Sequence, residues 1–232
     1  MHYKNIYKAK FLSRPNRFIA KVALEGMEET VHVKNTGRCR ELLVPGCTVY
    51  LEKSDNPTRK TAYDLVAVQK GDLLINMDSQ APNQVFGEWA QGGGFRDDLT
   101  LLKAETTWGR SRFDFYWEAG DERGFVEVKG CTLEENGLAL FPDAPTERGV
   151  KHLEELILAQ REGFSCAICF VLQMKGCHSF RPNEETHPEF ADALRKAAQA
   201  GVRILAMDCV VAPDWLTIDQ PVSVELELVR KA

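Results

Sequence analysis

Two carboxylates and a lysine lie close together in the middle of the chain. Asp114 is in the segment SRFDFYWE, and Glu127 and Lys129 are in GFVEVKG, beyond the turn AGDERG. If these segments pair as a hairpin that is symmetric about Gly120 and Asp121, then Asp114 lies opposite Glu127. Directly opposed residues have Cβ atoms about 5 Å apart, so two carboxylates there destabilise the sheet unless a cation or a proton lies between them.

The apolar residues of the two segments favour this register. It pairs Phe113 with Val128 and Phe115 with Val126, which gives one apolar face and leaves the carboxylates on the other. A shift of one residue would mix the two faces.

The spacing of these groups predicts a metal site. Carboxylate oxygens suit Mg²⁺ or Mn²⁺ better than zinc. Lys129 follows Glu127 by two residues, so both lie on the same side of the strand. There the lysine could orient or deprotonate an attacking water, or neutralise charge on a phosphate. The alternative is an exposed hairpin face with salt links, such as Glu127 with Arg112.

The surrounding elements indicate two domains. Before residue 80, short extended runs alternate with turns such as NTG, VPG and SDNPT, which predicts a small β-barrel. After it, helices are expected over PNQVFGEWAQ, residues 146–160 and PEFADALRKAAQAG, with strands between them. We therefore expect a barrel over residues 1–80 and a mixed α/β domain, with helices on a central sheet, over 81–232.

Charge is distributed unevenly between these parts. Residues 1–78 carry 13 basic and 9 acidic side chains, a net +4, while residues 79–232 carry 16 and 25, a net −9, which together give −5. A basic half joined to an acidic half suits a phosphate-binding module attached to a carboxylate-rich centre, although an ordinary solvated surface explains it as well. The candidate nucleic-acid contacts lie in or beside turns of the basic part, where phosphates are within reach. They are Arg14, Arg17, Arg38, Arg40, Arg59 and Lys60.

Cysteine usage and hydropathy indicate a cytoplasmic protein without a membrane partner. The seven cysteines are scattered and odd in number, as expected in a reducing compartment. No stretch approaches the ~20 apolar residues that cross a bilayer. The basic start MHYKNIYKAKF is followed by no apolar run, unlike a secretion signal.

Several motifs make the chain resemble a known family. An Asp, a loop and then Glu-x-Lys on paired strands is similar to the restriction-endonuclease-like metal nuclease fold. Five stretches, in matching order over nearly the whole chain, resemble the bacterial sugar fermentation stimulation protein family. They are KNTG (34–37), SDNPTRKTAY (54–63), SRFDF (111–115), VEVK (126–129) and FPDAPTERG (141–149).

The resemblance implies an oligonucleotide-binding-type barrel followed by a restriction-endonuclease-like domain. It also implies DNA binding of low sequence specificity and a regulatory role in sugar use. By position, Asp114 and Glu127 would be metal ligands and Lys129 the catalytic lysine. Glu88 matches the helical acid that often completes such sites, and Glu105 on the strand before Asp114 competes for that role.

Three further residues are candidates for supporting the site. Arg112 lies opposite Lys129 in the expected hairpin. Glu147 and Arg148 lie in the first turn of a predicted helix, where an acid suits the helix dipole without any function. Both, however, belong to the family signature FPDAPTERG.

Two functions are consistent with these residues and motifs. The first is a nuclease that depends on Mg²⁺ or Mn²⁺ and hydrolyses phosphodiesters at Asp114, Glu127 and Lys129. The second is a non-catalytic, low-specificity DNA-binding regulator of carbohydrate (maltose-type) metabolism. DNA or RNA, single or double strands, the metal and the oligomeric state stay open at this point.

Overall fold

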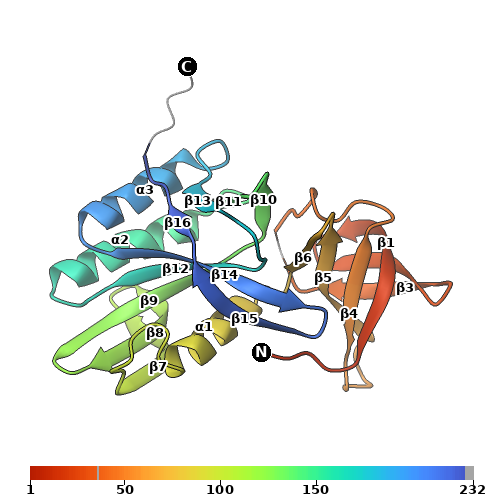
Figure 1. Cartoon of the computed structure of the whole chain (residues 1–232), viewed down its shortest axis with the longest axis horizontal. Helices are drawn as coiled ribbons and strands as arrows, with labels where there is room; N and C mark the ends of the chain where they lie inside the picture. Colours follow the sequence, from red (N-terminus) through yellow and green to blue (C-terminus); the bar gives the residue numbers. More distant parts are fainter. Residues whose placement is uncertain (36, 228–232) are drawn as a thin grey trace.

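The computed structural model describes residues 1–35 and 37–227, and it contains two domains side by side (Figure 1). The first is a closed β-barrel. The second is a mixed α/β domain with helices packed on a central sheet. The predicted fold class is therefore confirmed.

The barrel consists of strands that follow one another in the chain. They are β1 (Ile6–Asn16), β2 (Ile19–Leu24), β3 (Met27–Val33), β4 (Thr48–Lys53), β5 (Tyr63–Lys70) and β6 (Leu73–Asn76). β1 pairs with β2 and β4, β2 pairs with β3, and β5 pairs with β4 and β6, all in antiparallel directions. β3 also pairs with β5 in parallel, and this contact closes the sheet into a barrel.

The central sheet of the second domain contains the predicted hairpin near one edge. Its order is β15-β14-β12-β9-β8-β7, with β9, β12 and β14 parallel and the other pairings antiparallel. Its strands are β7 (Leu101–Trp108), β8 (Ser111–Ala119), β9 (Glu122–Cys131), β12 (Ala167–Leu172), β14 (Arg203–Ala212) and β15 (Trp215–Pro221). A smaller sheet contains β10 (Leu133–Glu135), β11 (Leu138–Phe141), β13 (Ser179–Pro182) and β16 (Ser223–Val224).

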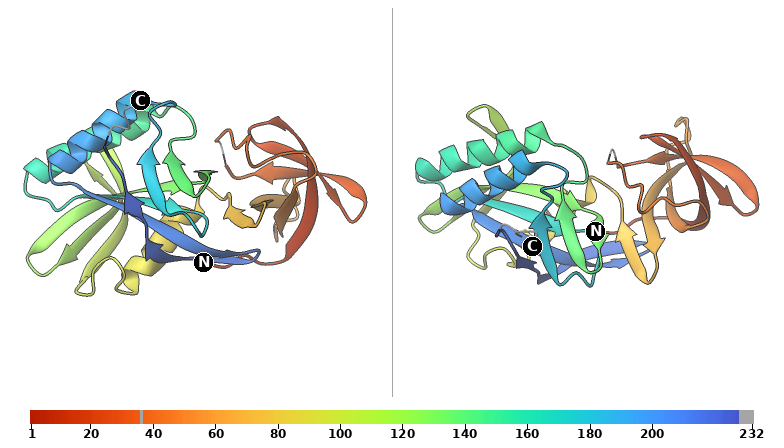
Figure 2. Two further views of the ribbon diagram at one scale, coloured as in Figure 1. Left: turned by 45° about the horizontal axis from the view of Figure 1, so that its top comes forward. Right: turned by 90° about the horizontal axis from the view of Figure 1, so that it is seen from above.

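Helices cover both faces of the central sheet (Figure 2). They are α1 (Ala81–Gln91), α2 (Glu147–Arg161) and α3 (Pro188–Gln199). Side chains of β12 alternate between the faces: Cys169 belongs to the buried cluster that contains Phe86 of α1, whereas Phe170 packs on Phe190 of α3. No helix in the described part of the chain is long and apolar enough to span a bilayer.

The helix ends follow from local sequence. α1 stops at Gln91, directly before Gly92, as predicted. α2 begins after Thr146, whose hydroxyl accepts a hydrogen bond from the Gly149 N–H at 3.1 Å. Such an N-cap satisfies one of the free N–H groups of the first turn.

A buried polar network joins the two domains. Lys34, directly after β3, donates to the Asp78 carboxylate at 2.8 Å, and Asp78 is 0% exposed. Gln173, directly after β12, donates to the Asn76 side chain at 2.8 Å and to the main-chain oxygen of Asp78 at 2.9 Å. Asn76 in turn donates to the Tyr3 hydroxyl at 2.8 Å. Because buried polar groups are costly when unpaired, this network fixes how the domains meet.

The first residues of the chain, which lie within the expected barrel range 1–80, contact the second domain. His2 forms an isolated bridge with Trp215 of β15, and the Tyr3 N–H donates to the Asp214 carbonyl at 2.7 Å. The start of the chain therefore lies beside β15 (Figure 1).

We expect Lys34→Met to lower the free energy of unfolding by about 3–5 kcal/mol, because it leaves the buried Asp78 carboxylate without its counter-charge. Urea unfolding of the full chain measures this change.

A matched control is Lys21→Met, since Lys21 forms an exposed ion pair with Glu28 at 3.1 Å. Its effect should stay below about 1 kcal/mol. Adding Asp78→Asn to Lys34→Met should restore stability, because the amide needs no counter-charge. Equal losses in the Lys34 and Lys21 variants would contradict the role given to the buried pair.

Candidate active site

The hairpin forms with the predicted register. β8 and β9 pair with Phe115 opposite Val126, and the ladder runs from there to the turn. At Asp114, one residue farther from the turn, the main-chain pairing of β8 with β9 stops. There the Val128 N–H donates a hydrogen bond to the side-chain Oδ2 of Asp114 at 2.8 Å. The predicted pairs from Asp114–Glu127 onward therefore lie outside the ladder.

Strand β8 changes face at Asp114. Phe115 belongs to the core cluster under α1, whereas Phe113 packs on Phe125, with ring centroids 5.0 Å apart, in the cluster under α2. The prediction that Phe113 and Phe115 share one apolar face is therefore wrong. The β7–β8 register skips the pair formed by Asp114 and Glu105, and Glu105 has a φ of 54°. This left-handed residue marks a local distortion that breaks the alternation of side chains.

Glu127 is a buried carboxylate with two basic partners. It is 1% exposed, and its Oε1 accepts hydrogen bonds from Lys129 Nζ at 2.6 Å and from His152 Nδ1. Its Oε2 is buried and has no hydrogen-bond partner among the described residues. Burial raises the pKa of Glu127, but the bond from His152 and the charge of Lys129 outweigh burial and hold that pKa below its ordinary value. Glu127 is therefore ionised, with one oxygen free for a ligand.

Asp114 is held from two sides. Asn83 of α1 donates to its Oδ1 at 2.8 Å, and the main chain of Val128 donates to its Oδ2. Burial raises the pKa of Asp114, and the negative charge of Glu127 raises it further. Two carboxylates that oppose each other's ionisation favour a cation between them.

His152 is a site residue that the local sequence patterns did not indicate. It lies on α2, one turn after Arg148, whose Nε donates to His152 Nε2 at 3.3 Å. That bond leaves Nδ1 to donate to Glu127. The available signal was the spacing of four residues between Arg148 and His152, which puts both on one face of a helix. Arg148 thus supports the site through His152.

The other two supporting candidates lie elsewhere. Arg112 forms an ion pair with Glu105, and its side chain is 60% exposed. The Glu147 side chain is 92% exposed, and its carboxylate lies 3.7 Å from the His187 ring. Among the described residues, neither one has a hydrogen bond or ion pair with Glu127 or Lys129.

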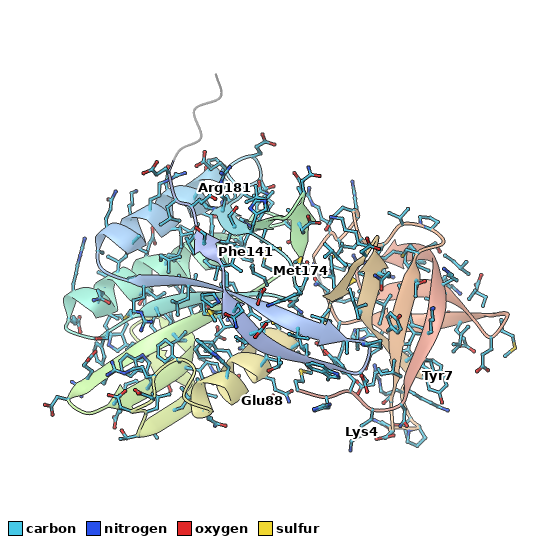
Figure 3. The ribbon with its side chains drawn as sticks, in the orientation of Figure 1. Lys4, Tyr7, Glu88, Phe141, Met174 and Arg181 are labelled. Carbon is cyan, nitrogen blue, oxygen red and sulfur yellow. The ribbon has the colours of Figure 1, made fainter. Side chains whose placement is uncertain are left out.

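Glu88 lies on α1 (Figure 3) and does not join the two strand carboxylates. It forms an ion pair with the Met1 ammonium group at 2.5 Å. Glu88, Glu105 and Asp114 all line a shallow depression of about 400 Å³. Within residues 1–35 and 37–227, however, no three His, Cys, Asp or Glu side chains are grouped so that they could hold a metal ion. The predicted ligand set of Glu88, Asp114 and Glu127 is therefore not assembled in this structure.

Four of the six predicted nucleic-acid contacts surround one depression of about 420 Å³ in the barrel domain. They are Arg14, Arg17, Arg38 and Arg40. We call this feature the arginine depression. The other two lie outside it: Arg59 is bound by both oxygens of Asp64, at 2.6 and 2.7 Å, and Lys60 is exposed in its loop.

Comparison with known proteins gives consistent matches for both parts of the chain. The family model for the SfsA N-terminal OB domain matches residues 12–77, and the model for the sugar fermentation stimulation protein RE domain matches residues 80–215. A sugar fermentation stimulation protein homolog from Desulfitobacterium hafniense (strain Y51) is 58% identical over 226 residues, 97% of this chain and 99% of the relative. A homolog from Ruminiclostridium cellulolyticum is 54% identical and covers 97% of this chain and 100% of the relative.

A solved structure also matches both domains. The structure of Pyrococcus furiosus SfsA in complex with Ca²⁺ superposes with a TM-score of 0.87 at 28% identity, over 97% of this chain and 98% of that chain. The chain therefore belongs to the sugar fermentation stimulation protein family, with an N-terminal OB domain and a C-terminal RE domain.

Proposed function

We propose that this protein binds nucleic acid and hydrolyses phosphodiester bonds with a divalent cation held by Asp114 and Glu127. The observation that carries the proposal is the buried Oε2 of Glu127, which has no hydrogen-bond partner among the described residues. An unpaired charged oxygen is costly inside a protein, and a bound cation would remove that cost.

The donor set fits a hard cation. Mg²⁺ prefers oxygen and is commonly bound by one or two carboxylates, while water and substrate phosphates complete its shell. Asp114 and Glu127 supply two carboxylates, so a third acid such as Glu88 is not required. The Pyrococcus furiosus relative in complex with Ca²⁺, another oxygen-preferring cation, supports the same class of ion here.

Each neighbouring side chain has a role in this proposal. A bound Mg²⁺ or Mn²⁺ would polarise the phosphate and activate water. Lys129, whose side chain is 18% exposed, would donate to a phosphate oxygen and neutralise the charge that develops in the transition state. His152 keeps Glu127 in place, and Asn83 does the same for Asp114.

The barrel supports nucleic acid as the substrate. Its arginine depression offers guanidinium groups that match the geometry of phosphate. Contacts to phosphate carry no sequence information, which would make binding weakly specific. DNA is the nucleic acid we propose first, with RNA as the comparison.

The seven cysteines support the cytoplasm as the compartment. All seven are free thiols, and six of them are buried. Proteins of reducing compartments keep their thiols in this form.

A different observation favours a second function. Among the described residues, the acids expected to complete a metal site do not form one group. A nuclease-like centre that has lost catalysis would look the same. The protein would then be a non-catalytic, low-specificity DNA-binding regulator of carbohydrate (maltose-type) metabolism, in keeping with the family name.

Cleavage of labelled single- and double-stranded DNA and RNA with Mn²⁺ or Mg²⁺ separates the two functions. We expect Asp114→Asn and Lys129→Ala each to lower the cleavage rate by about 100-fold or more, because the first weakens the cation site and the second removes a positive charge that stabilises the transition state. The variants should keep the fold and the affinity for DNA.

Two matched controls are available on exposed positions nearby. Lys103→Ala removes a lysine from β7, and Asp121→Asn changes an acid in the hairpin turn. Both should cleave at the wild-type rate. A folded wild type that binds DNA without cutting any substrate would favour the regulator instead.

Metal-free stability offers a test that is independent of cleavage. The folded pKa of Asp114 lies above its ordinary value, so its ionised form costs stability at neutral pH, and this cost fades as the pH falls through the folded pKa. Asp114→Asn should therefore stabilise the metal-free protein at neutral pH and less so in acid.

Added Mn²⁺ should stabilise the wild type much more than Asp114→Asn. At about 100 times its Kd, a bound cation stabilises the wild type by about 2.7 kcal/mol, and Asp114→Asn should lose most of this gain. Thermal unfolding with and without Mn²⁺ measures both effects. An equal gain in both proteins would mean that the cation binds elsewhere.

A further inference from the structure

The loop after β3 is shaped by an arginine whose two terminal nitrogens are already used. Arg14 Nη1 donates to the carbonyls of Gly37 and Arg38, and Nη2 donates to those of Asn35 and Arg17, at 2.7–3.0 Å. These four bonds leave the two terminal nitrogens of Arg14 little capacity for a ligand. Arg14 is therefore a brace for the loop rather than a contact.

The other three arginines of the depression keep their guanidinium groups available. Arg17, Arg38 and Arg40 are exposed, and Arg17 lies over the Phe18 ring at 4.8 Å from its centroid. No Asp or Glu is among the described residues that line the depression. A concave surface with positive charge and no carboxylate concentrates anions, and arginine forks bind phosphate through paired hydrogen bonds.

A residue of the other domain holds this loop. Asp143, in the segment between β11 and α2, accepts a hydrogen bond from the Arg38 N–H with its Oδ2 at 3.0 Å. A Cβ added at Gly37 would overlap the same oxygen, so a larger residue there would push the Asp143 carboxylate aside. Asp143 does not line the depression. Its carboxylate thus reaches the main chain of the loop and leaves the arginine side chains free.

We infer that the arginine depression binds a backbone phosphate of the nucleic acid through Arg17, Arg38 and Arg40, with Asp143 as a positioning residue. The phosphate site rests on the proposed nucleic-acid binding, whereas the positioning of the loop by Asp143 does not. The contact also gives the signature segment FPDAPTERG a role in each domain. Asp143 orders the arginine loop, while Arg148 supports His152 beside Glu127.

Two substitutions at one position separate positioning from charge. Asp143→Asn keeps an oxygen that can accept the Arg38 N–H, whereas Asp143→Ala removes the acceptor. If Asp143 acts by position, the alanine variant should bind a fluorescent single-stranded oligonucleotide about tenfold more weakly, and the asparagine variant should match the wild type. If Asp143 acted only by its negative charge, both variants would bind more tightly, and the inference would be overturned.

The direct contacts are tested by salt dependence. In the Arg38→Ala, Arg40→Ala double variant, affinity should fall and the slope of log K against log salt should flatten by about 0.7 for each phosphate of a single strand that the variant no longer neutralises. Lys103→Ala, which removes a positive charge from the other domain, is the control and should change neither. Inorganic pyrophosphate should compete with the oligonucleotide in the wild type. Unchanged affinity and slope in the double variant would place the phosphate elsewhere and overturn the proposed site.

Amide hydrogen exchange at Arg38 tests the positioning without any ligand. It should be faster in Asp143→Ala than in the wild type and unchanged in Asp143→Asn. Unchanged exchange in the alanine variant would overturn the positioning role even if cleavage is found. A wild type that binds no nucleic acid would instead defeat the proposed function, and the exchange result would still stand.

Discussion

A carboxylate inside a sheet must be neutralised, and Glu127 imposes this constraint on much of the second domain. It is 1% exposed, and its partners come from two elements, Lys129 on β9 and His152 on α2. α2 must therefore pack with His152 turned toward the sheet. Arg148, one turn earlier on the same helix, donates to the imidazole and orients it. Even so, one oxygen remains without a partner among the described residues. Buried charge that is only partly compensated is typical of sites that bind a ligand.

The two domains divide the charge between them. Positive groups gather in the barrel around the arginine depression, while the uncompensated negative charge lies on β8 and β9. Under the proposed function, such an arrangement suits a polyanion that is held at one place and cut at another. The junction of Lys34, Asp78 and Gln173 keeps the two places at a fixed separation.

Local patterns were sufficient to predict the fold class and the register of the β8–β9 hairpin, because alternation and turn residues act over few positions. They missed β1: the first extended run that they indicated before residue 80 is RFIAKVAL, and residues 6–16 combine lysines and arginine with apolar side chains and change register against β2. They also placed Phe113 on the wrong face, because the distortion at Glu105 belongs to the neighbouring strand. His152 and Asp143 act through contacts 25 and 105 residues away, which no local pattern encodes.

Because β8 changes face at Asp114, the residue at this position can vary while the strand keeps its place. Phe113 and Phe115 anchor the strand in two separate cores, so the backbone at position 114 is held by its neighbours as well as by the bond from the Val128 N–H to the Asp114 side chain. An asparagine could still accept that bond, so under the proposed function a lineage could exchange the aspartate, lose the chemistry and retain the shape. If the proposed function holds, family members with the same architecture and different residues at this position need not share an activity, and the residue at 114 would then be a better guide to activity than overall identity.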